Sequence, residues 1–224
     1  MVLKFDLHVH SGYSHDGHDS IDTILQRAKE IGLDGIAITD HDTIQGGLIG
    51  IQRAKELDLD LMVIPGVEIS TTKGHLIVLG ITDEIPPGMS LERTIEMARD
   101  LGGTVIVPHP FHPFRHGLGY IPEDIDAVEI YNSRFIIGYS NEKARKLAVE
   151  GNIPTVAGSD AHIAEMIGYA ITEINAAPSV DKILQAIRAG DAQVKGEMTP
   201  LRLFAKQTLK AVFRYTRRFL SEHL

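Results

Sequence analysis

The feature that most constrains the fold of this chain is the regular alternation of short apolar segments with amphipathic ones. Short apolar runs predict strands, whereas apolar residues spaced three or four positions apart predict helices. Strands are expected at 3–9, 35–39, 61–67, 75–81, 104–108, 127–131, 153–158, 168–174 and 192–196, and helices at 20–32, 43–57, 90–102, 141–151 and 179–190. Buried strands that alternate with helices form parallel sheets covered by helices. The sequence therefore predicts an α/β protein, and the number of units favours a (β/α) barrel over a doubly wound open sheet.

The composition narrows the class of protein. The chain has 224 residues, a formal net charge of −8 and no cysteine, which excludes disulfide bridges, thiolate zinc sites and cysteine nucleophiles. No apolar run approaches the roughly 18 residues of a membrane span. The N-terminus lacks the cationic start and apolar core of a signal peptide, so we expect a cytoplasmic protein. The 11 histidines stand out, because histidine is the commonest metal ligand.

Histidine and carboxylate side chains gather where the predicted strands end. His8 and His10 alternate on the first strand and project from one face, and Asp6 shares that spacing and could orient one of the rings. Similar residues directly follow four later strands, namely Asp40, His41 and Asp42; Glu68; His109; and Asp160 and His162. The strand ends of a barrel converge on one mouth, where so much charge would be costly without a cation. We therefore expect a metal site there.

A further candidate ligand lies in the loop after the first strand. Asp16 follows His10 by six positions, and Gly12 and Gly17 allow the loop to fold back toward the mouth. His15 and His18 are alternatives in the same loop, and ordinary loop polarity would also explain these side chains.

His75 differs from the other candidates because it begins a predicted strand. The gap after Glu68 is about six residues, which is too short for a crossover between parallel strands. A hairpin with Gly74 in its turn would instead place His75 beside Glu68 at the same mouth.

These residues form the motif series DLHVHS, AITDHDT, GVEIS, PHP and GSDAH, which runs from residue 6 to residue 162. The series resembles that of the PHP (polymerase and histidinol phosphatase) family. The resemblance implies a distorted (β/α)7 TIM-like barrel that holds two or three divalent metal ions. Carried over by motif, the metal ligands are His8, His10, Asp16, His41, Glu68, His75, His109, Asp160 and His162. Residues 1–196 would then form the PHP barrel, and residues 197–224 a basic amphipathic helical tail.

The expected ligands suit a particular chemistry. Mixed imidazole and carboxylate ligands favour Zn, Mn or Fe, and two clustered metals suit displacement at a phosphate ester through a metal-activated hydroxide. Glu68 is expected to bridge the metals. His41, Asp160 or a metal-bound water would protonate the leaving group. The expected catalytic residues are therefore Glu68, His41 and Asp160.

Three residues are candidates for substrate contacts. Arg115 follows the PHP motif and Arg134 follows the predicted strand 127–131, and a guanidinium group matches a phosphate. Each arginine could equally be an ordinary surface residue. His112 lies in the same loop as Arg115 and could also contact the substrate.

The last segment differs in charge from the rest of the chain. Residues 199–224 contain six basic residues and one acidic residue, a net +5, which leaves −13 for residues 1–198. The periodicity predicts an amphipathic helix. The helix could pack on the barrel with a solvated basic edge, or it could dock an acidic surface, a second subunit or a nucleic acid.

The predicted function is the hydrolysis of a small phosphomonoester, such as a nucleotide or histidinol phosphate. An exonuclease or oligonucleotide phosphodiesterase with the same metal centre is the alternative, which the basic tail favours. An amidohydrolase that cleaves C–N bonds is disfavoured because no lysine ends a predicted strand, and a non-catalytic scaffold is disfavoured because no ligand position is degenerate. The expected partners are a small phosphorylated substrate or a nucleic acid, with a homo-oligomer as a further option.

Overall fold

The computed structural model describes residues 1–112, 116–134 and 138–223, with residues 214–223 described by backbone alone. Within these residues each predicted strand and helix is present. The strands are β1 (Val2–Val9), β2 (Gly35–Ile38), β3 (Met62–Ser70), β4 (His75–Leu79), β5 (Thr104–Val107), β6 (Ala127–Asn132), β7 (Thr155–Gly158), β8 (Ala170–Asn175) and β9 (Ala192–Gly196). The helices are α1 (Ile21–Glu30), α2 (Gln45–Glu56), α3 (Leu91–Asp100), α4 (Tyr139–Glu150), α5 (Val180–Ala189) and α6 (Leu201–His223), with a short 3-10 turn, η1 (Ala164–Met166).

The strands form one curled sheet in the order β7-β6-β5-β4-β3-β2-β1-β8-β9. Strands β1, β2 and β3 pair in parallel, and so do β5, β6 and β7. The end of β7 returns to the end of β1, where Val9 and Ala161 form an isolated parallel bridge and the backbone N–H of His10 donates to Ala161 O at 2.8 Å. This nearly closed sheet confirms the predicted barrel and excludes the open doubly wound sheet.

Two hairpins distort the barrel. Strand β4 runs antiparallel between β3 and β5, because a tight turn in which Thr71 N donates to Gly74 O at 2.9 Å joins it to β3. The second hairpin, β8–β9, runs antiparallel beside the first half of β1 and lies against β7. It thus fills the seam between the first and last barrel strands on the side away from the mouth.

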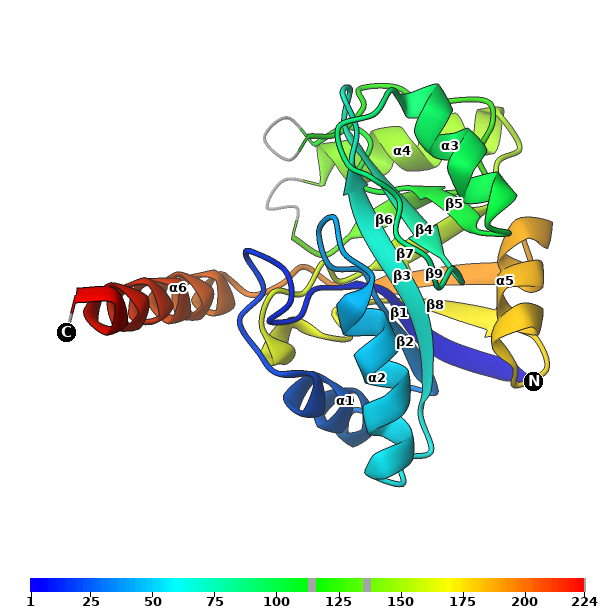
Figure 1. Cartoon of the computed structure of the whole chain (residues 1–224). Helices are drawn as coiled ribbons and strands as arrows, with labels where there is room; N and C mark the ends of the chain where they lie inside the picture. Colours follow the sequence, from blue (N-terminus) through cyan, green and yellow to red (C-terminus); the bar gives the residue numbers. More distant parts are fainter. Residues whose placement is uncertain (113–115, 135–137, 224) are drawn as a thin grey trace.

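Side chains inside and outside the barrel form separate apolar clusters. Inside, Phe5, Ile64, Ile77 and Ile106 pack together with residues of α5. Figure 1 shows α5 near the end of the sheet where β1 begins, so α5 closes that end. Outside, α1 and α2 cover one flank of the sheet and α3 and α4 another. The carboxyl ends of the parallel strands β1, β2 and β3 lie at the opposite end of the barrel.

Serine caps explain where three of the helices begin. The hydroxyl groups of Ser20, Ser90 and Ser179 accept hydrogen bonds from backbone N–H groups three residues later, at 3.3, 3.2 and 3.4 Å. These bonds satisfy N–H groups that have no partner inside the helix. Gly190 ends α5 with φ 77°, a left-handed conformation that glycine adopts without strain.

The expectation that Asp6 shares a face with the two histidines of β1 and orients a ring is wrong. The pairing of β1 with β2 shifts register between Asp6 and Val9, so Leu7 packs inside the barrel whereas Val9 packs with the helices outside. Asp6 instead accepts hydrogen bonds from the backbone N–H groups of Ser159 and Gly168, both at 2.9 Å. Its carboxylate therefore fastens β1 to the chain around β7.

The predicted C-terminal helix forms as α6, which projects from the open side of the barrel in Figure 1. Its first turns pack against the outer cluster through Leu203 and Phe204. The division of the chain into domains at residue 196 stays a prediction. Among the described residues, no helix has both the length and the apolarity that crossing a membrane requires.

The close packing of β7 against β1 predicts that a small substitution in β7 lowers the stability of the fold. A methyl group on Gly158 would overlap the Cβ of His8 and crowd the carboxylate of Glu129. We therefore expect Gly158→Ala to lower the free energy of unfolding by about 1–3 kcal/mol, as measured by denaturant unfolding. Gly138→Ala is the matched control, because a Cβ there meets nothing within 4 Å. Equal stability of the two variants would contradict this account of the seam.

Candidate metal centre at the barrel mouth

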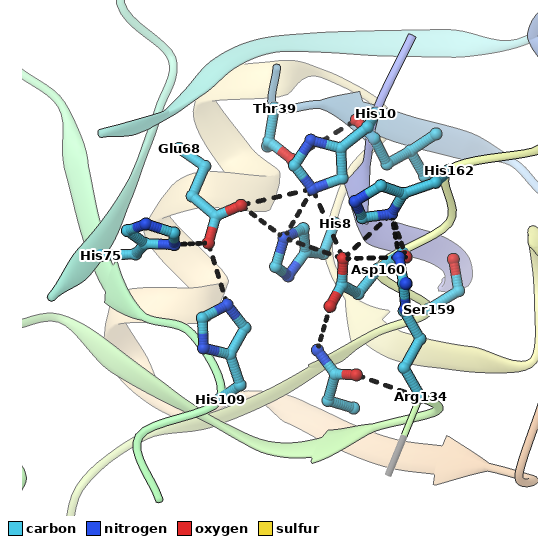
Figure 2. A network of polar contacts seen from close by, with 12 residues as sticks. His8, His10, Thr39, Glu68, His75, His109, Arg134, Ser159, Asp160 and His162 are labelled. Carbon is cyan, nitrogen blue, oxygen red and sulfur yellow. Dashed lines mark hydrogen bonds and ion pairs between the residues drawn. The ribbon is translucent and has the colours of Figure 1, made fainter. Parts of the chain in front are cut away.

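The buried carboxylate of Glu68 lies at the centre of the mouth, surrounded by imidazole rings (Figure 2). Its Oε1 atom lies 2.9 Å from His75 Nδ1 and 2.9 Å from His109 Nε2. Its Oε2 atom lies 3.1 Å from His8 Nε2, 3.2 Å from His10 Nε2 and 3.6 Å from His41 Nδ1. One carboxylate therefore links side chains that come from five separate positions in the sequence.

The strand order explains why these rings meet. His41 follows β2 and forms an isolated parallel bridge with Glu68 near the end of β3. Ser70 pairs with His75 across the β3–β4 hairpin, which brings the start of β4 to the mouth as the short gap in the sequence predicts. His109 follows β5 with φ 30°, an unusual value for a residue other than glycine, which turns the chain sharply at the strand end.

A second carboxylate, that of Asp160, lies beside the same rings. Its Oδ1 atom is 3.4 Å from His10 Nε2 and 3.3 Å from His162 Nδ1. The ring of His162 reaches on to Asp16, with Nε2 at 2.7 Å from Asp16 Oδ2, and His41 Nε2 lies 3.5 Å from the same oxygen. Asp160 has φ 53°, so a left-handed turn again follows a barrel strand directly.

All nine predicted ligands fall into four overlapping groups whose donor atoms lie within 4.8 Å of one another. The groups are His10, Asp16, His41 and His162; His8, His10 and Asp160; His8, Glu68 and His109; and His41, Glu68 and His75. Of the three loop candidates, Asp16 belongs to a group, whereas His15 and His18 belong to none of the groups found among the described residues. The ligand roles themselves stay predictions.

The donor set fits divalent cations. The Nε2 atoms of His8 and His10 face each other at 3.1 Å, and both approach two carboxylates, an arrangement that requires positive charge between them. The buried Nδ1 atoms of His10 and His109 have no hydrogen-bond partner among the described residues. Mixed imidazole nitrogens and carboxylate oxygens suit Zn, Mn or Fe. The donor atoms are therefore arranged as in a divalent-cation site.

The pKa values of groups in this centre are consistent with a site for cations. Burial opposes protonation of His10, but hydrogen bonds to Asp160 and Glu68 outweigh it and raise the pKa of His10 to about 9. Burial also opposes ionisation of Glu68, yet the charges of His8 and His41 hold its pKa well below the usual range. Without metal, protons on histidine thus neutralise the carboxylates, and a bound cation would take their place.

His162 differs from the other histidines. Burial, together with the positive charges of His10 and Arg134, lowers the pKa of His162 to about 3. A neutral imidazole is the form that coordinates metals. Its Nδ1 atom lies 2.9 Å from the carbonyl oxygen of Asp160, a contact that would orient the ring with Nε2 toward the candidate ligand Asp16.

The sequence reasoning missed Glu129 and Asn132, which contact the candidate ligands on the side away from the pocket. The Glu129 carboxylate lies 3.0 Å from His8 Nδ1 and accepts a hydrogen bond from the backbone N–H of His109 at 2.9 Å. Asn132 donates to Glu129 at 3.0 Å and to Asp160 at 3.2 Å. The sequence feature that could have identified Glu129 is a carboxylate within the otherwise apolar predicted strand AVEIY.

The centre forms the floor of a pocket of about 500 Å³. The predicted contact residues His112 and Arg134 line it, together with His15 and His116. Arg115 lies outside the described residues. A further lining residue, Gln207, comes from α6, and the sequence pattern had given no reason to select it.

Arg134 is largely buried in the wall of this pocket. Its Nη1 atom donates to the carbonyl oxygen of Asp160 at 3.2 Å and contacts His162 Nδ1, and its Nη2 atom donates to Gln207 Oε1 at 3.2 Å. The guanidinium also lies over the ring of Phe204, 5.6 Å from its centroid. These contacts fix a cationic group beside the metal centre.

Comparison with known proteins identifies the family. A family model described as PHP-associated matches residues 138–192. An uncharacterised protein of Methanocaldococcus jannaschii is 38% identical over 154 residues, which cover 63% of this chain and 89% of that protein. The chain belongs to the PHP family. Its relatives include a diphosphodiesterase and exoribonucleases, and the donor groups at the mouth could hold the metal ions of a phosphoesterase.

Other PHP relatives match over shorter segments. Phosphoribosyl 1,2-cyclic phosphate 1,2-diphosphodiesterase of Eggerthella lenta is 36% identical over 101 residues, 39% of this chain and 37% of that protein. A 5′-3′ exoribonuclease of Haemophilus influenzae is 45% identical over 71 residues, 32% of this chain and 25% of that protein. The chain thus spans well under half the length of each of these two relatives.

A solved structure supports the PHP barrel. A two-domain protein from Bacteroides vulgatus, described as containing a predicted PHP-like metal-dependent phosphoesterase, superposes with a TM-score of 0.74 at 19% identity. The match covers 88% of this chain and 65% of that protein. The two structures are therefore similar over most of this chain.

The support from Glu129 gives a prediction for the PHP centre. Glu129→Gln keeps the shape of the side chain but removes the charge beside His8 Nδ1. Loss of such a partner lowers metal affinity by about 10- to 100-fold. We expect a loss of that size in titrations of the metal-free protein with Zn²⁺ or Mn²⁺. The control is Glu150→Gln at the exposed end of α4, and similar affinities for the two variants would show that Glu129 does not support the ligand.

Proposed function

We propose that this chain hydrolyses a small phosphomonoester, such as a nucleotide or histidinol phosphate, at a centre of two or three divalent metal ions. The observation that carries the proposal is the pocket of about 500 Å³ that is lined by seven of the nine candidate ligands and by Arg134. The other two, His8 and His10, contact the lining residue Glu68. A pocket of this size accommodates a small ligand. Belonging to the PHP family supports the same reaction class.

Different residues are proposed to bind the metals, to bind the substrate and to transfer a proton. The four donor groups would hold the cations, with Glu68 shared between two of the groups. Bound divalent cations of the Zn, Mn or Fe type supply a water of lowered pKa and Lewis-acid stabilisation of the phosphoryl oxygens. Protein residues then have to orient the ester, neutralise its charge and deliver a proton to the leaving oxygen.

Arg134 and His112 are the proposed contacts to the phosphoryl group. The guanidinium of Arg134 is already fixed by Asp160, Phe204 and Gln207, so little side-chain entropy is lost when an anion arrives. Arg115 keeps its predicted role beside them as a proposal.

His41 and Asp160 are the proposed proton carriers for the leaving group. Both line the pocket, and both lie against carboxylate or imidazole groups that can exchange a proton. Asp160 is almost fully buried, whereas the side chain of His41 is 10% exposed. His41 is therefore the better placed of the two to reach a leaving oxygen that points toward solvent.

An exonuclease is the second candidate, and the similarity to an exoribonuclease favours it. The basic residues of α6 support it less than their number suggests. Lys206 pairs with Glu165 at 2.6 Å, and Lys210 pairs with Asp19 at 2.7 Å. These cations are engaged by the protein itself. An amidohydrolase that depends on a lysine has no support, since no lysine lines the pocket in the described part of the chain.

Ligand substitutions test the metal centre. We expect metal analysis to find at least two divalent transition ions per chain. His10→Ala and Asp160→Asn should lose metal and phosphoesterase activity together, because each residue belongs to a donor group shared with His8. Full activity of the chelated, metal-free protein would overturn the proposed function.

A substrate panel separates the two candidate functions. With Mn²⁺, Zn²⁺ or Fe²⁺ loaded, we expect hydrolysis of phosphomonoesters to exceed that of oligonucleotides, with little change between 50 and 200 mM salt. A nuclease that neutralised 6–10 phosphates would lose about 10³–10⁵ in affinity over that range. Preferential, strongly salt-dependent cleavage of oligonucleotides would favour the exonuclease.

A further inference from the structure

The first turns of α6 are fastened to the barrel mouth. Lys210 Nζ lies 2.7 and 2.8 Å from the two carboxylate oxygens of Asp19, at the end of the loop that carries Asp16. Asp19 also accepts a hydrogen bond from the backbone N–H of Ala164 at 2.7 Å. Lys206 pairs with Glu165 in the adjacent η1 turn. α6 is therefore held against both segments that border the donor group of Asp16.

This docking brings one polar side chain of α6 to the pocket. Gln207 is the one residue of α6 among the described residues that line the metal pocket. It follows Lys206 directly and precedes Lys210 by less than one helical turn, so the two ion pairs fix its position. Its side chain is partly buried and reaches Arg134.

The contact with Arg134 settles the orientation of the Gln207 amide. A guanidinium has donors and no acceptor, so the atom that faces Arg134 Nη2 at 3.2 Å must be the amide oxygen. The amide NH₂ group is then the part of Gln207 that is left to donate to another acceptor. Because Arg134 provides the positive charge at this wall, the acceptor that fits beside it is an anionic oxygen.

We propose that Gln207 is a substrate-binding residue, whose amide NH₂ donates a hydrogen bond to a phosphoryl oxygen beside Arg134. This inference rests on the proposed phosphoesterase function and adds α6 to the site. The C-terminal helix is then a wall of the phosphate subsite, and its lysines hold that wall in place.

Inorganic phosphate is the probe, with binding to metal-loaded protein measured by calorimetry and metal content measured in parallel. Gln207→Ala removes the donor, and we expect about tenfold weaker phosphate binding with unchanged metal content. Gln207→Glu can still accept from Arg134 but offers no donor and adds a negative charge, so we expect a still larger loss. The control is Gln185→Ala on the exposed face of α5, which should bind phosphate as the wild type does.

Two results would contradict a role of the Gln207 amide in phosphate binding. Phosphate binding by Gln207→Glu as tight as that of the wild type or tighter would overturn the proposal, because a neutral amide donor would then not be needed. Phosphate binding of Gln207→Ala within twofold of the wild type would overturn it as well, while leaving the proposed function intact. A wild-type protein that is loaded with metal but neither binds phosphate nor cleaves any phosphate ester would instead remove the proposed function itself.

Discussion

The interaction on which the site depends is the burial of one carboxylate, that of Glu68, among five imidazole rings. A charge removed from water costs several kcal/mol unless its surroundings compensate it. The compensating groups come from β1, from the turn after β2, from the start of β4 and from the turn after β5. The strand ends must therefore meet within a few ångströms, and the closed sheet is what holds them there.

The need to aim side chains into the mouth also explains backbone conformations that would otherwise be unfavourable. His109 and Asp160 both adopt positive φ directly after a barrel strand. Such conformations cost about 1–3 kcal/mol for residues other than glycine and persist where the surroundings determine them. Here, Glu129 accepts from the backbone of His109, and Asn132 donates to Asp160. Glu129 and Asn132 thus stabilise the turns that carry the candidate ligands His109 and Asp160.

Much of the fold could be predicted from the sequence, because strand and helix periodicity is a local property. The hairpin that brings His75 to Glu68 followed from a short gap and a glycine. Asp6 was placed wrongly because a register shift in β1 depends on the pairing of two strands and leaves no local signal. Glu129 and Gln207 were missed because their roles depend on which distant elements lie opposite them, and the net charge of α6 could not show that two of its lysines are neutralised by the barrel.

The way in which the barrel closes has a consequence for the folding of this chain. In the described part of the chain, Val9 and Ala161 form an isolated bridge between the end of β1 and the chain after β7. Candidate ligands flank both residues, with His8 and His10 on one side of the bridge and Asp160 and His162 on the other. A cation held by His8, His10 and Asp160 would cross-link the beginning and the end of the barrel where few backbone hydrogen bonds do so. Binding of such a cation would therefore favour the closed ring over an opened one.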